Sequence, residues 1–247
     1  MNLVIDVGNT NAKICVYCGD DLVSKTVVPS SGMAISSGMR MEAARHGIGA
    51  CILGSVKGDF PEVEVTAREL GIVFYQLTPT TPVPISNGYS TPETLGADRL
   101  AAAVGASVIF PGSDVLIIDA GTAITYDMLI NGSEFAGGNI APGIMLRLKA
   151  LHDYTSRLPL VEPNMPCRDF GLRTAEAVNN GVVLGVAREI EGYVADLKQK
   201  NVKAQIILTG GDSIFLSKLL KIAIFAAPNL VTIGLNRILN YNVSKNR

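Results

Sequence analysis

The chain has 247 residues, of which 48% are apolar and 17% charged, and its formal net charge is −1. This balance argues against a partner recognised through a basic surface, such as nucleic acid or an anionic membrane. No apolar run approaches the roughly 18 residues that a membrane span requires, and no basic, signal-like segment precedes Asp6. We therefore expect a cytoplasmic protein.

The first half of the sequence alternates strands with helices. Hydrophobic periodicity predicts strands at 2–6, 12–17, 22–28, 50–53 and 72–77, and helices at 34–46 and 61–70. A polar loop with four prolines follows between Thr78 and Gly96, and its length predicts a lid or the wall of a pocket. The Ala-rich stretch 97–110 predicts a helix that Pro111-Gly112 ends. We place a domain boundary there, which gives domains 1–111 and 112–247.

The second half repeats this plan. The pattern predicts strands at 115–119, 124–130, 134–136 and 205–208, and helices at about 142–151, 174–198, 213–221 and 229–240. Asn131-Gly132 between two apolar runs is a strong hairpin signal. Strands that alternate with helices, with hairpins at the start of each half, predict mixed α/β sheets with helices packed outside.

A duplicated motif is the most informative feature of the chain. The run 3–10 reads LVIDVGNT and the run 116–122 reads LIIDAGT, so that Asp119 follows Asp6 by 113 positions. In each copy an apolar strand ends in Asp, then Gly, then a hydroxyl residue. Glycine lets the backbone approach a phosphate, and the Asp carboxylate can hold a hydrated cation that neutralises phosphate charge. The duplication therefore predicts two related domains that face each other across a nucleotide.

Further motifs give the chain a family resemblance. Besides the two hairpins they are Gly96-Ala97-Asp98-Arg99, Gly137–Gly143, Arg173–Ala177 and Thr209-Gly210-Gly211-Asp212. In order and spacing they resemble type III pantothenate kinases, members of the sugar kinase, Hsp70 and actin superfamily. The resemblance covers essentially the whole chain. It implies two duplicated ribonuclease-H-like domains with mixed sheets and the nucleotide in the cleft between them.

The same resemblance implies an activity. These enzymes transfer phosphate from ATP to the primary hydroxyl of pantothenate, which gives 4′-phosphopantothenate in the first step of coenzyme A synthesis. The implied cofactors are magnesium with ATP and a monovalent cation, potassium or ammonium. The implied partners are ATP, pantothenate and a second copy of the chain in a homodimer, with no nucleic acid and no membrane.

The ATP-binding residues are expected in the two hairpins. They are Asp6, Val7, Gly8, Asn9, Thr10, Asn11, Ala12, Lys13 and Thr122. Asp6 would orient magnesium through water, Asn9 and Thr10 would hold phosphate oxygens, and Lys13 would add positive charge. The alternatives are an ordinary turn and a solvated lysine. The element 209–212 would line the adenosine side, unless it is a plain strand-to-helix turn.

Asp119 has two interpretations. The resemblance assigns it to the monovalent cation, whereas a second water-mediated magnesium contact is the alternative. Both ions take oxygen ligands, so the sequence leaves the choice open. Thr122 is expected by internal symmetry to meet phosphate, as Thr10 does in the first copy.

The pantothenate-binding residues follow from the resemblance. They are Tyr89, Gly96, Ala97, Asp98, Arg99 and Thr174. Asp98 would be the general base that accepts the hydroxyl proton, and the Arg99 fork of donors suits the pantothenate carboxylate. The alternatives are a helix start at Asp98, a tyrosine at 89 that packs its own loop, and a helix cap at Thr174. The role of His152 stays open.

The predicted long helix carries small residues on one face, at Ala177, Gly181 and Gly185. This face predicts either packing within the domain or the dimer contact of the family, and we favour the dimer. The cysteines Cys15, Cys18, Cys51 and Cys167 offer no second C-x-x-C pair for zinc, so we expect reduced, buried thiols.

Two other functions remain to be weighed against a kinase. A non-catalytic nucleotide-binding regulator on the same fold, such as a transcription accessory protein, would tolerate the loss of Asp98, which this chain keeps. An actin-like filament subunit would need a polymer interface that the sequence does not indicate.

Overall fold

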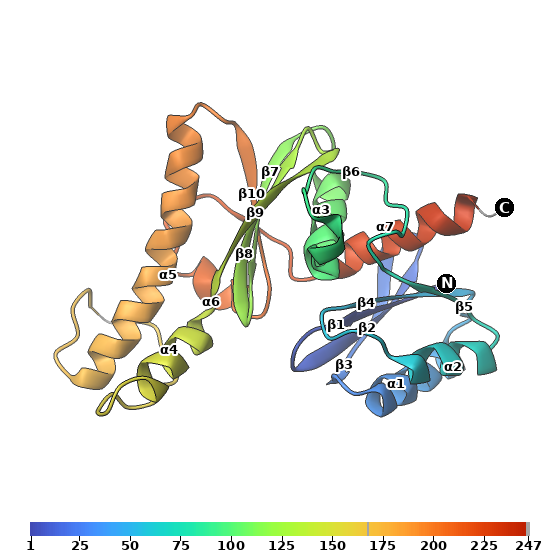
Figure 1. The fold of residues 1–247 in the computed structure, drawn as a ribbon, viewed down its shortest axis with the longest axis horizontal. Helices are drawn as coiled ribbons and strands as arrows, with labels where there is room; N and C mark the ends of the chain where they lie inside the picture. The colour runs from blue at the N-terminus through green and yellow to red at the C-terminus, as the bar shows by residue number, and fades with distance from the viewer. Residues whose placement is uncertain (167, 246–247) are drawn as a thin grey trace. The chain divides into compact units, whose positions relative to one another are not determined.

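The computed structural model describes residues 1–166 and 168–245, so that Cys167, expected as a buried thiol, lies outside the described residues. The chain divides into two compact units (Figure 1). Unit 1 comprises Met1–Ser113, Leu129–Gly137 and Asn229–Arg247, and unit 2 comprises Asp114–Met128 and Gly138–Pro228. The boundary between duplicated domains at 111/112 stays a prediction, and the compact units differ from it because two later segments pack with the first.

The sheet of unit 1 has five strands in the order β3-β2-β1-β4-β5. The strands are β1 (Asn2–Val7), β2 (Asn11–Cys18), β3 (Asp21–Pro29), β4 (Ala50–Ser55) and β5 (Val73–Gln76). Strands β1, β2 and β3 pair antiparallel, whereas β4 runs parallel to β1 and β5 parallel to β4. The three-strand hairpin unit predicted from the sequence is confirmed.

Alternation along β1 decides which way its carboxylate points. Leu3, Ile5 and Val7 are fully buried in a core with residues of α1 (Gly32–Arg45) and α2 (Pro61–Glu69). Successive side chains of a strand point to opposite faces. Asn2 and Asp6 therefore point to the other face, where Asn2 bonds Asn236 of α7 (Leu230–Lys245).

Helices α3 (Ala97–Ile109) and α7 cross very closely in unit 1. A Cβ built on Gly234 of α7 would lie 1.8 Å from the carbonyl oxygen of Ala101, and one on Gly105 of α3 would lie 2.3 Å from that of Leu230. Only glycine permits this approach at either position. The crossing fixes α3, and with it the Gly-Ala-Asp-Arg motif at its first turn.

The second sheet repeats the order of the first. Its order is β11-β10-β7-β8-β9-β6, and β10 runs parallel to β7 and to β11. The strands are β6 (Ser86–Asn87), β7 (Asp114–Ala120), β8 (Ala123–Ile130), β9 (Glu134–Pro142), β10 (Ala204–Thr209) and β11 (Phe225–Ala226). Strands β9-β8-β7-β10-β11 thus match β3-β2-β1-β4-β5, which confirms two mixed sheets built on one duplicated plan.

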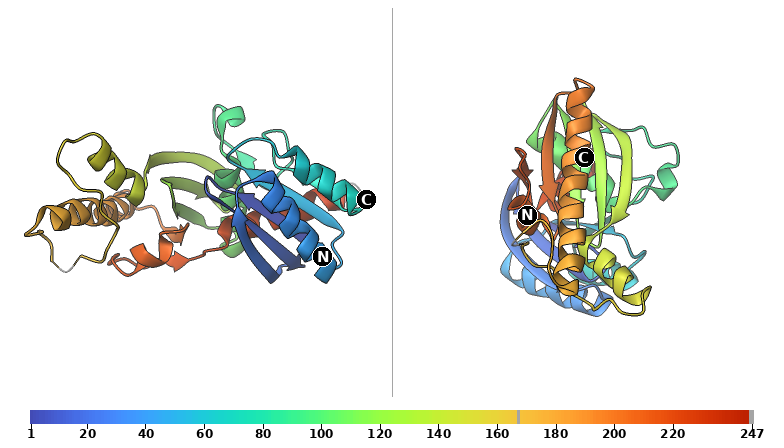
Figure 2. Two further views of the ribbon diagram at one scale, coloured as in Figure 1. Left: turned by 90° about the horizontal axis from the view of Figure 1, so that it is seen from below. Right: turned by 90° about the vertical axis from the view of Figure 1, so that its left-hand side faces the viewer.

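In unit 2 the helix α5 (Thr174–Gln199) lies along the sheet (Figures 1 and 2). Leu116, Ile118 and Ala120 of β7 share a core with α4 (Ile144–Asp153), α5 and α6 (Ser213–Ser217). Because β7 alternates as β1 does, Asp119 points to the face opposite α5. The two Asp-x-Gly copies therefore have the same orientation in their own sheets.

Several predicted elements need correction. The polar loop 78–96 holds two short elements that the pattern did not predict, since β6 pairs in it and a 3₁₀ turn spans Pro92–Thr94. Strand β9 runs on through Gly137-Gly138 to Pro142, α6 ends at Ser217 rather than 221, and β11 was missed. Cys18 is exposed rather than buried, whereas Cys15 and Cys51 are buried as expected.

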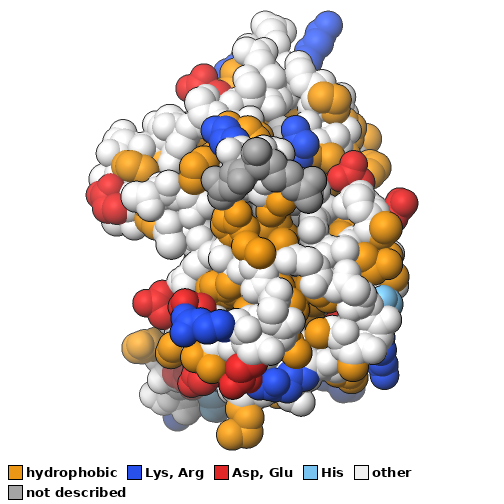
Figure 3. All heavy atoms as spheres, turned by 90° about the vertical axis from the view of Figure 1, so that its right-hand side faces the viewer, with side chains coloured by type: hydrophobic (Ala, Val, Ile, Leu, Met, Phe, Trp, Pro, Cys, Tyr) orange, Lys and Arg blue, Asp and Glu red, His pale blue; other side chains and the backbone are white. Residues whose placement is uncertain are grey.

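The surface agrees with the near-neutral composition. On the face drawn in Figure 3, basic and acidic side chains are interspersed. Among the helices of the described residues, none combines the length and the apolar character needed to cross a bilayer.

Candidate functional site

The turn after β1 is held by backbone bonds and by one serine. The Gly8 N–H donates to the Asn11 carbonyl at 3.0 Å, and the Ser30 hydroxyl donates to the Gly8 carbonyl at 2.7 Å. Asn9, Thr10 and Asn11 are exposed at the tip, whereas the side chains of Val7 and Ala12 are buried in the core. Of the predicted ATP-binding residues, these two can offer only backbone groups to a ligand.

Asp6 and Lys13 form an ion pair beside this turn. They lie opposite each other in the β1–β2 register, and Nζ of Lys13 is 3.1 Å from Oδ2 of Asp6. The Asp6 side chain is 12% exposed and that of Lys13 34%. A carboxylate and an ammonium therefore stand together at a strand end, next to exposed amide and hydroxyl groups.

Asp6 and Asp98 line the same small recess in unit 1. Its other lining residues come from the ends of β1 and β4, from α3 and from α7, and they are Val7, Gly54, Ser55, Val56, Ala97, Val231 and Leu235. The parallel pairing of β1 with β4 places Asp6 opposite Gly54. Two predicted site residues that are 92 positions apart in the sequence are thus brought to one place.

Asp98 lies in the first turn of α3. Gly96 is the N-cap, and Oδ1 of Asp98 accepts the backbone N–H of Arg99 at 2.8 Å. A Cβ on Gly96 would lie 2.5 Å from that oxygen, so a larger residue would displace the carboxylate. The positive end of the helix dipole favours the ionised carboxylate. The helix start and a catalytic role are therefore compatible.

Arg99 is 5% exposed and lies against two aromatic rings. Its Cζ is 5.4 Å from the ring centroid of Tyr89 and 5.6 Å from that of Phe135. Tyr89 thus does more than pack its own loop. Phe135 is fully buried, and no motif in the sequence singled it out.

Asp119 ends β7 in unit 2 and lies beside Gly210. A Cβ on Gly210 would come within 2.5 Å of Oδ1 of Asp119 and 2.3 Å of the Ala120 carbonyl oxygen, and Gly210 has a φ of +91°. A side chain is excluded there on both grounds. The Thr-Gly-Gly-Asp element therefore lies directly against the second Asp-x-Gly turn, and the Asp212 N–H donates to the Ala120 carbonyl at 2.9 Å.

The turn at Thr122 is held by the start of α4. The Gly143 N–H donates to the Thr122 carbonyl at 3.0 Å. A Cβ on Gly143 would lie 2.1 Å from the Gly121 carbonyl oxygen, so that glycine is required. The Thr122 side chain is exposed.

The structure bears on the alternative roles of two secondary candidates. Thr174 is the first residue of α5 and is exposed, but Arg173 is the N-cap, so that Thr174 is not the cap. His152 lies in the last turn of α4, and its Nδ1 is 2.9 Å from the Leu158 carbonyl oxygen. That contact supports a structural role for His152.

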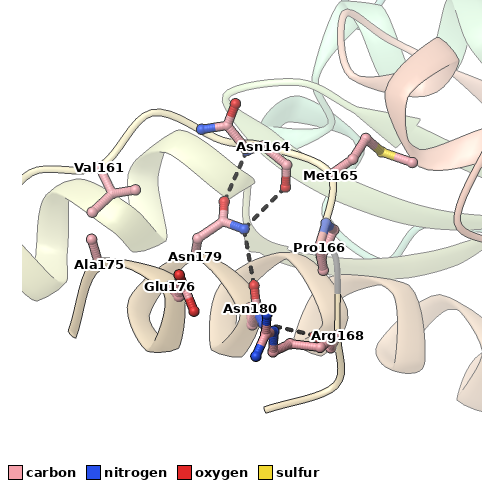
Figure 4. A pocket seen from close by; sticks show the side chains of 9 residues that line it. All are labelled: Val161, Asn164, Met165, Pro166, Arg168, Ala175, Glu176, Asn179 and Asn180. Carbon is pink, nitrogen blue, oxygen red and sulfur yellow. Dashed lines mark hydrogen bonds between the residues drawn. The ribbon is translucent and has the colours of Figure 1, made fainter. Parts of the chain in front are cut away.

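A pocket of about 310 Å³ opens in unit 2, lined by loop residues within 161–166, by Arg168 and by the start of α5 (Figure 4). Asn179 holds the loop by two bonds to the backbone of Asn164, at 2.8 and 3.0 Å, and Asn180 donates to the Arg168 carbonyl. None of the predicted site residues lines this pocket.

The described residues offer a metal ion single carboxylates rather than a cluster. Within residues 1–166 and 168–245, no group of three Asp, Glu, His or Cys side chains is placed to hold an ion. Mg²⁺ in phosphate-transfer sites is commonly bound by one or two carboxylates together with substrate phosphates and water. Asp6, at the strand end beside Lys13, fits that mode.

Two residues of the site could not be found from the sequence. Ser30 follows an exposed strand and lies 22 positions from the Gly8 carbonyl that it binds. Phe135 is an isolated aromatic in a predicted strand. Neither residue belongs to a motif, because the contacts of both arise only from tertiary packing.

Two sheets on one duplicated plan, each with an Asp-x-Gly turn at its central strand, define the class of sugar kinase and actin-like ATPase folds. Within that class the chain belongs to the type III pantothenate kinase family, whose model matches residues 2–196.

Curated relatives agree over the full length. The chain is 43% identical over 242 residues to the type III pantothenate kinase of Bacteroides fragilis, with 98% of each chain covered. It is 40% identical over 246 residues to that of Porphyromonas gingivalis, with 98% of this chain and 99% of the relative covered.

Solved structures share the fold. A Campylobacter jejuni protein, provisionally described as a Baf family transcriptional activator, matches with a TM-score of 0.61 and 24% identity over 98% of this chain and 99% of that one. The activator of 2-hydroxyisocaproyl-CoA dehydratase from Clostridium difficile, with bound ADPNP, matches with a TM-score of 0.57 and 12% identity, over 99% and 96% of the chains.

Proposed function

We propose that this protein phosphorylates the primary hydroxyl of pantothenate with ATP, the entry step of coenzyme A biosynthesis. It would act as a phosphotransferase with an alcohol group as acceptor. Family membership supports the substrate pair. The single observation that carries the chemistry is the recess that Asp6 and Asp98 share, because it brings a candidate base next to the phosphate-binding turn.

Asp98 is the proposed general base. Phosphoryl transfer depends mainly on positioning and on charge stabilisation, so that a weakly basic carboxylate suffices to orient the hydroxyl and accept its proton late. The bond from the Arg99 N–H holds one carboxylate oxygen of Asp98, which fixes the direction of the group.

The β1–β2 turn is proposed to bind the phosphates of ATP. Backbone N–H groups of Asn9 and Thr10 and the exposed side chains of these two residues offer donors, and Lys13 adds positive charge. Asp6 would hold magnesium through water, and the ion when bound would neutralise part of the phosphate charge. Thr122 plays the corresponding part in the second copy of the motif.

Asp119 is proposed to hold a monovalent cation, potassium or ammonium. Its carboxylate lies against the glycine backbone of the Thr-Gly-Gly-Asp element. A single carboxylate with oxygen-rich backbone around it suits a large, weakly charged ion better than it suits bare Mg²⁺. The element 209–212 is proposed to line the adenosine side.

Pantothenate is proposed to bind between the loop 78–96 and the first turn of α3. Arg99 would bind its carboxylate with a planar pair of donors. Tyr89, which lies over the same guanidinium, and the backbone of Gly96 and Ala97 would complete the pocket. Thr174 would contact pantothenate from the start of α5.

A homodimer through α5 is part of this proposal. A Cβ built on Gly181 or Gly185 meets no described atom within 4 Å, so that α5 is not packed against its own chain at these two positions in the described residues. We expect Gly185→Leu to give a monomer by sedimentation and to weaken pantothenate binding more than ATP binding, because the β1–β2 turn lies within one chain. A monomer with normal pantothenate binding would separate the dimer from catalysis.

The deciding experiment is a coupled ADP-release assay on the purified protein with ATP and pantothenate, with and without potassium. Pantothenate-dependent ADP release, with 4′-phosphopantothenate identified by mass, is expected. Tight ATP binding without any pantothenate-dependent turnover would instead indicate the nucleotide-binding regulator.

A further inference from the structure

The aromatic pair Tyr89–Phe135 contains one ring to which the proposed function gives no role. Cζ of Arg99 lies 5.4 Å and 5.6 Å from the two ring centroids, and the centroids are 6.0 Å apart. The ring planes are inclined by 57°, so that the two rings form an open angle with the guanidinium over both. A cation over an aromatic face is attracted by the ring quadrupole, and more strongly where water is excluded.

Backbone pairing places Phe135 in this position. Strand β6 runs parallel to β9, where the Ser86 N–H donates to the Ser133 carbonyl at 2.8 Å and the Gly88 N–H to the Phe135 carbonyl at 2.9 Å. A Cβ on Gly88 would lie 3.0 Å from the same carbonyl oxygen. The short strand therefore ties the loop that carries Tyr89 to the strand that carries Phe135.

Burial makes the orientation of Arg99 matter. The residue is 5% exposed and Phe135 is fully buried, so that little water reaches the guanidinium. An arginine side chain in water has many rotamers, and a ligand that must fix one of them loses affinity to the entropy cost. If two ring faces hold the guanidinium plane before the ligand binds, much of this entropy cost is avoided on binding.

We infer that Phe135 is a positioning residue for the pantothenate carboxylate. With Tyr89 it holds the Arg99 guanidinium in one orientation, so that the donor fork is set before the substrate arrives. This inference rests on the proposed function, in which Arg99 binds the carboxylate. Phe135 acts through Arg99 and takes no part in the transfer of phosphate.

The first test replaces the ring by an aliphatic side chain of similar size. Phe135→Leu is expected to raise the KM for pantothenate about 5- to 30-fold, the range of a desolvated cation–π contact. The KM for ATP and kcat are expected to stay close to wild type. Phe74→Leu is the matched control, because Phe74 packs partly buried on the unit 1 core away from this cluster. Phe74→Leu also removes a ring, and the KM for pantothenate is expected to stay unchanged.

A double-mutant cycle tests whether Phe135 acts through Arg99. Arg99→Met removes the charge and keeps an unbranched apolar chain. If Phe135 works only by holding the guanidinium, Phe135→Leu adds little further loss in kcat/KM for pantothenate in the Arg99→Met background. Additive losses would overturn the inference, as would an unchanged KM in a folded Phe135→Leu protein.

Folding and the proposed function are controlled separately. If Phe135→Leu does not give a cooperative melt, the flexible Phe135→Met fills the same site and takes its place in both measurements. Wild-type turnover of pantothenate is measured first. Its absence contradicts the proposed function, whereas wild-type turnover together with a normal KM in the ring variants contradicts only the role of Phe135.

Discussion

The ends of β1 and β7 carry the same Asp-x-Gly signature on the same sheet plan, yet their surroundings differ. At β1 the turn spans residues 8–10, and Asp6 is paired with Lys13 and shares a recess with Asp98. At β7 the turn spans only 121–122, and Asp119 lies against the backbone of Gly210. Duplication kept the scaffold, and residues outside the Asp-x-Gly motif made the two ends different.

The comparison identifies the groups that distinguish the two strand ends. A strand that ends in a carboxylate is common to both copies. At the end of β1 the Asp6 carboxylate is joined by the ammonium of Lys13 from β2 and by the carboxylate of Asp98 from α3. At the end of β7 the Asp119 carboxylate lies against the backbone of Gly210 instead. We therefore expect charge changes at the two ends to have different consequences.

The largest effect is expected from Asp98→Asn, which removes what β1 has and β7 lacks. The amide keeps the size and loses the proton acceptor, so that kcat should fall about 10²- to 10⁴-fold. ATP binding, measured by titration calorimetry, should survive. Asp20→Asn, on an exposed turn, is the control for loss of one negative charge. Nearly full turnover in Asp98→Asn would reduce Asp98 to a helix-start residue.

A smaller effect is expected from Asp119→Asn. Loss of a charged ligand should lower kcat/KM for ATP about 10- to 100-fold and abolish any difference between potassium and sodium buffers. The matched change Asp6→Asn should instead alter the magnesium dependence and leave the potassium dependence in place. Equal wild-type rates in sodium and potassium at matched ionic strength would contradict the monovalent site.

Lys13→Met should have a more modest effect, because the Lys13 side chain is about one-third exposed and its charge is screened by solvent. We expect the KM for ATP to rise about 3- to 10-fold at low salt, with a smaller rise at high salt. Lys25→Met serves as the control. Lys25 lies on the neighbouring strand β3, and its ammonium donates to the side chain of Asn229. An identical rise in both variants would mean a general charge effect.

The smallest effect is expected at Asp212, whose N–H donates to the carbonyl of Ala120, the residue after Asp119. Burial raises the pKa of the Asp212 carboxyl above its ordinary value of 3.8. The folded state therefore binds this proton more tightly than the unfolded state, and the ionised group lowers stability once the pH is above the folded pKa. Asp212→Asn should raise the Tm at pH 7 by about 1–2 °C, because the group is half-exposed. The gain should shrink as the pH falls towards 4.

Local patterns predicted most of the scaffold. The short apolar run before Asp6 predicted a buried strand that ends there, and Asn131-Gly132 predicted a hairpin, in which both residues adopt positive φ, 49° and 61°. These are short-range effects, since each depends on residues within one turn or strand. Family motifs predicted Asp98 and Arg99, and the structure places them at the start of one helix, with Asp98 on the same recess as Asp6.

Long-range contacts account for the rest. Ser30, Phe135 and β6 have their roles only because distant segments pair, and no local periodicity encodes such pairing. The sequence predicted α7 as a closing helix, but its glycine contact with α3 depends on two positions that are each unremarkable in a helix. The close crossing of the two helices depends on Gly234 and Gly105 together.

The crossing of α3 and α7 also sets an order of events during synthesis. Helix α3 is made long before α7, and all of unit 2 leaves the ribosome between them. Until Gly234 reaches Gly105, α3 lacks its packing partner and the face of β1 that carries Asp6 is uncovered. Domains made early often fold first, but here α3, which carries Asp98, acquires its packing partner only when α7 has been made. A nascent chain therefore carries both carboxylates well before it can bring them together, and activity should appear only after α7 has been made.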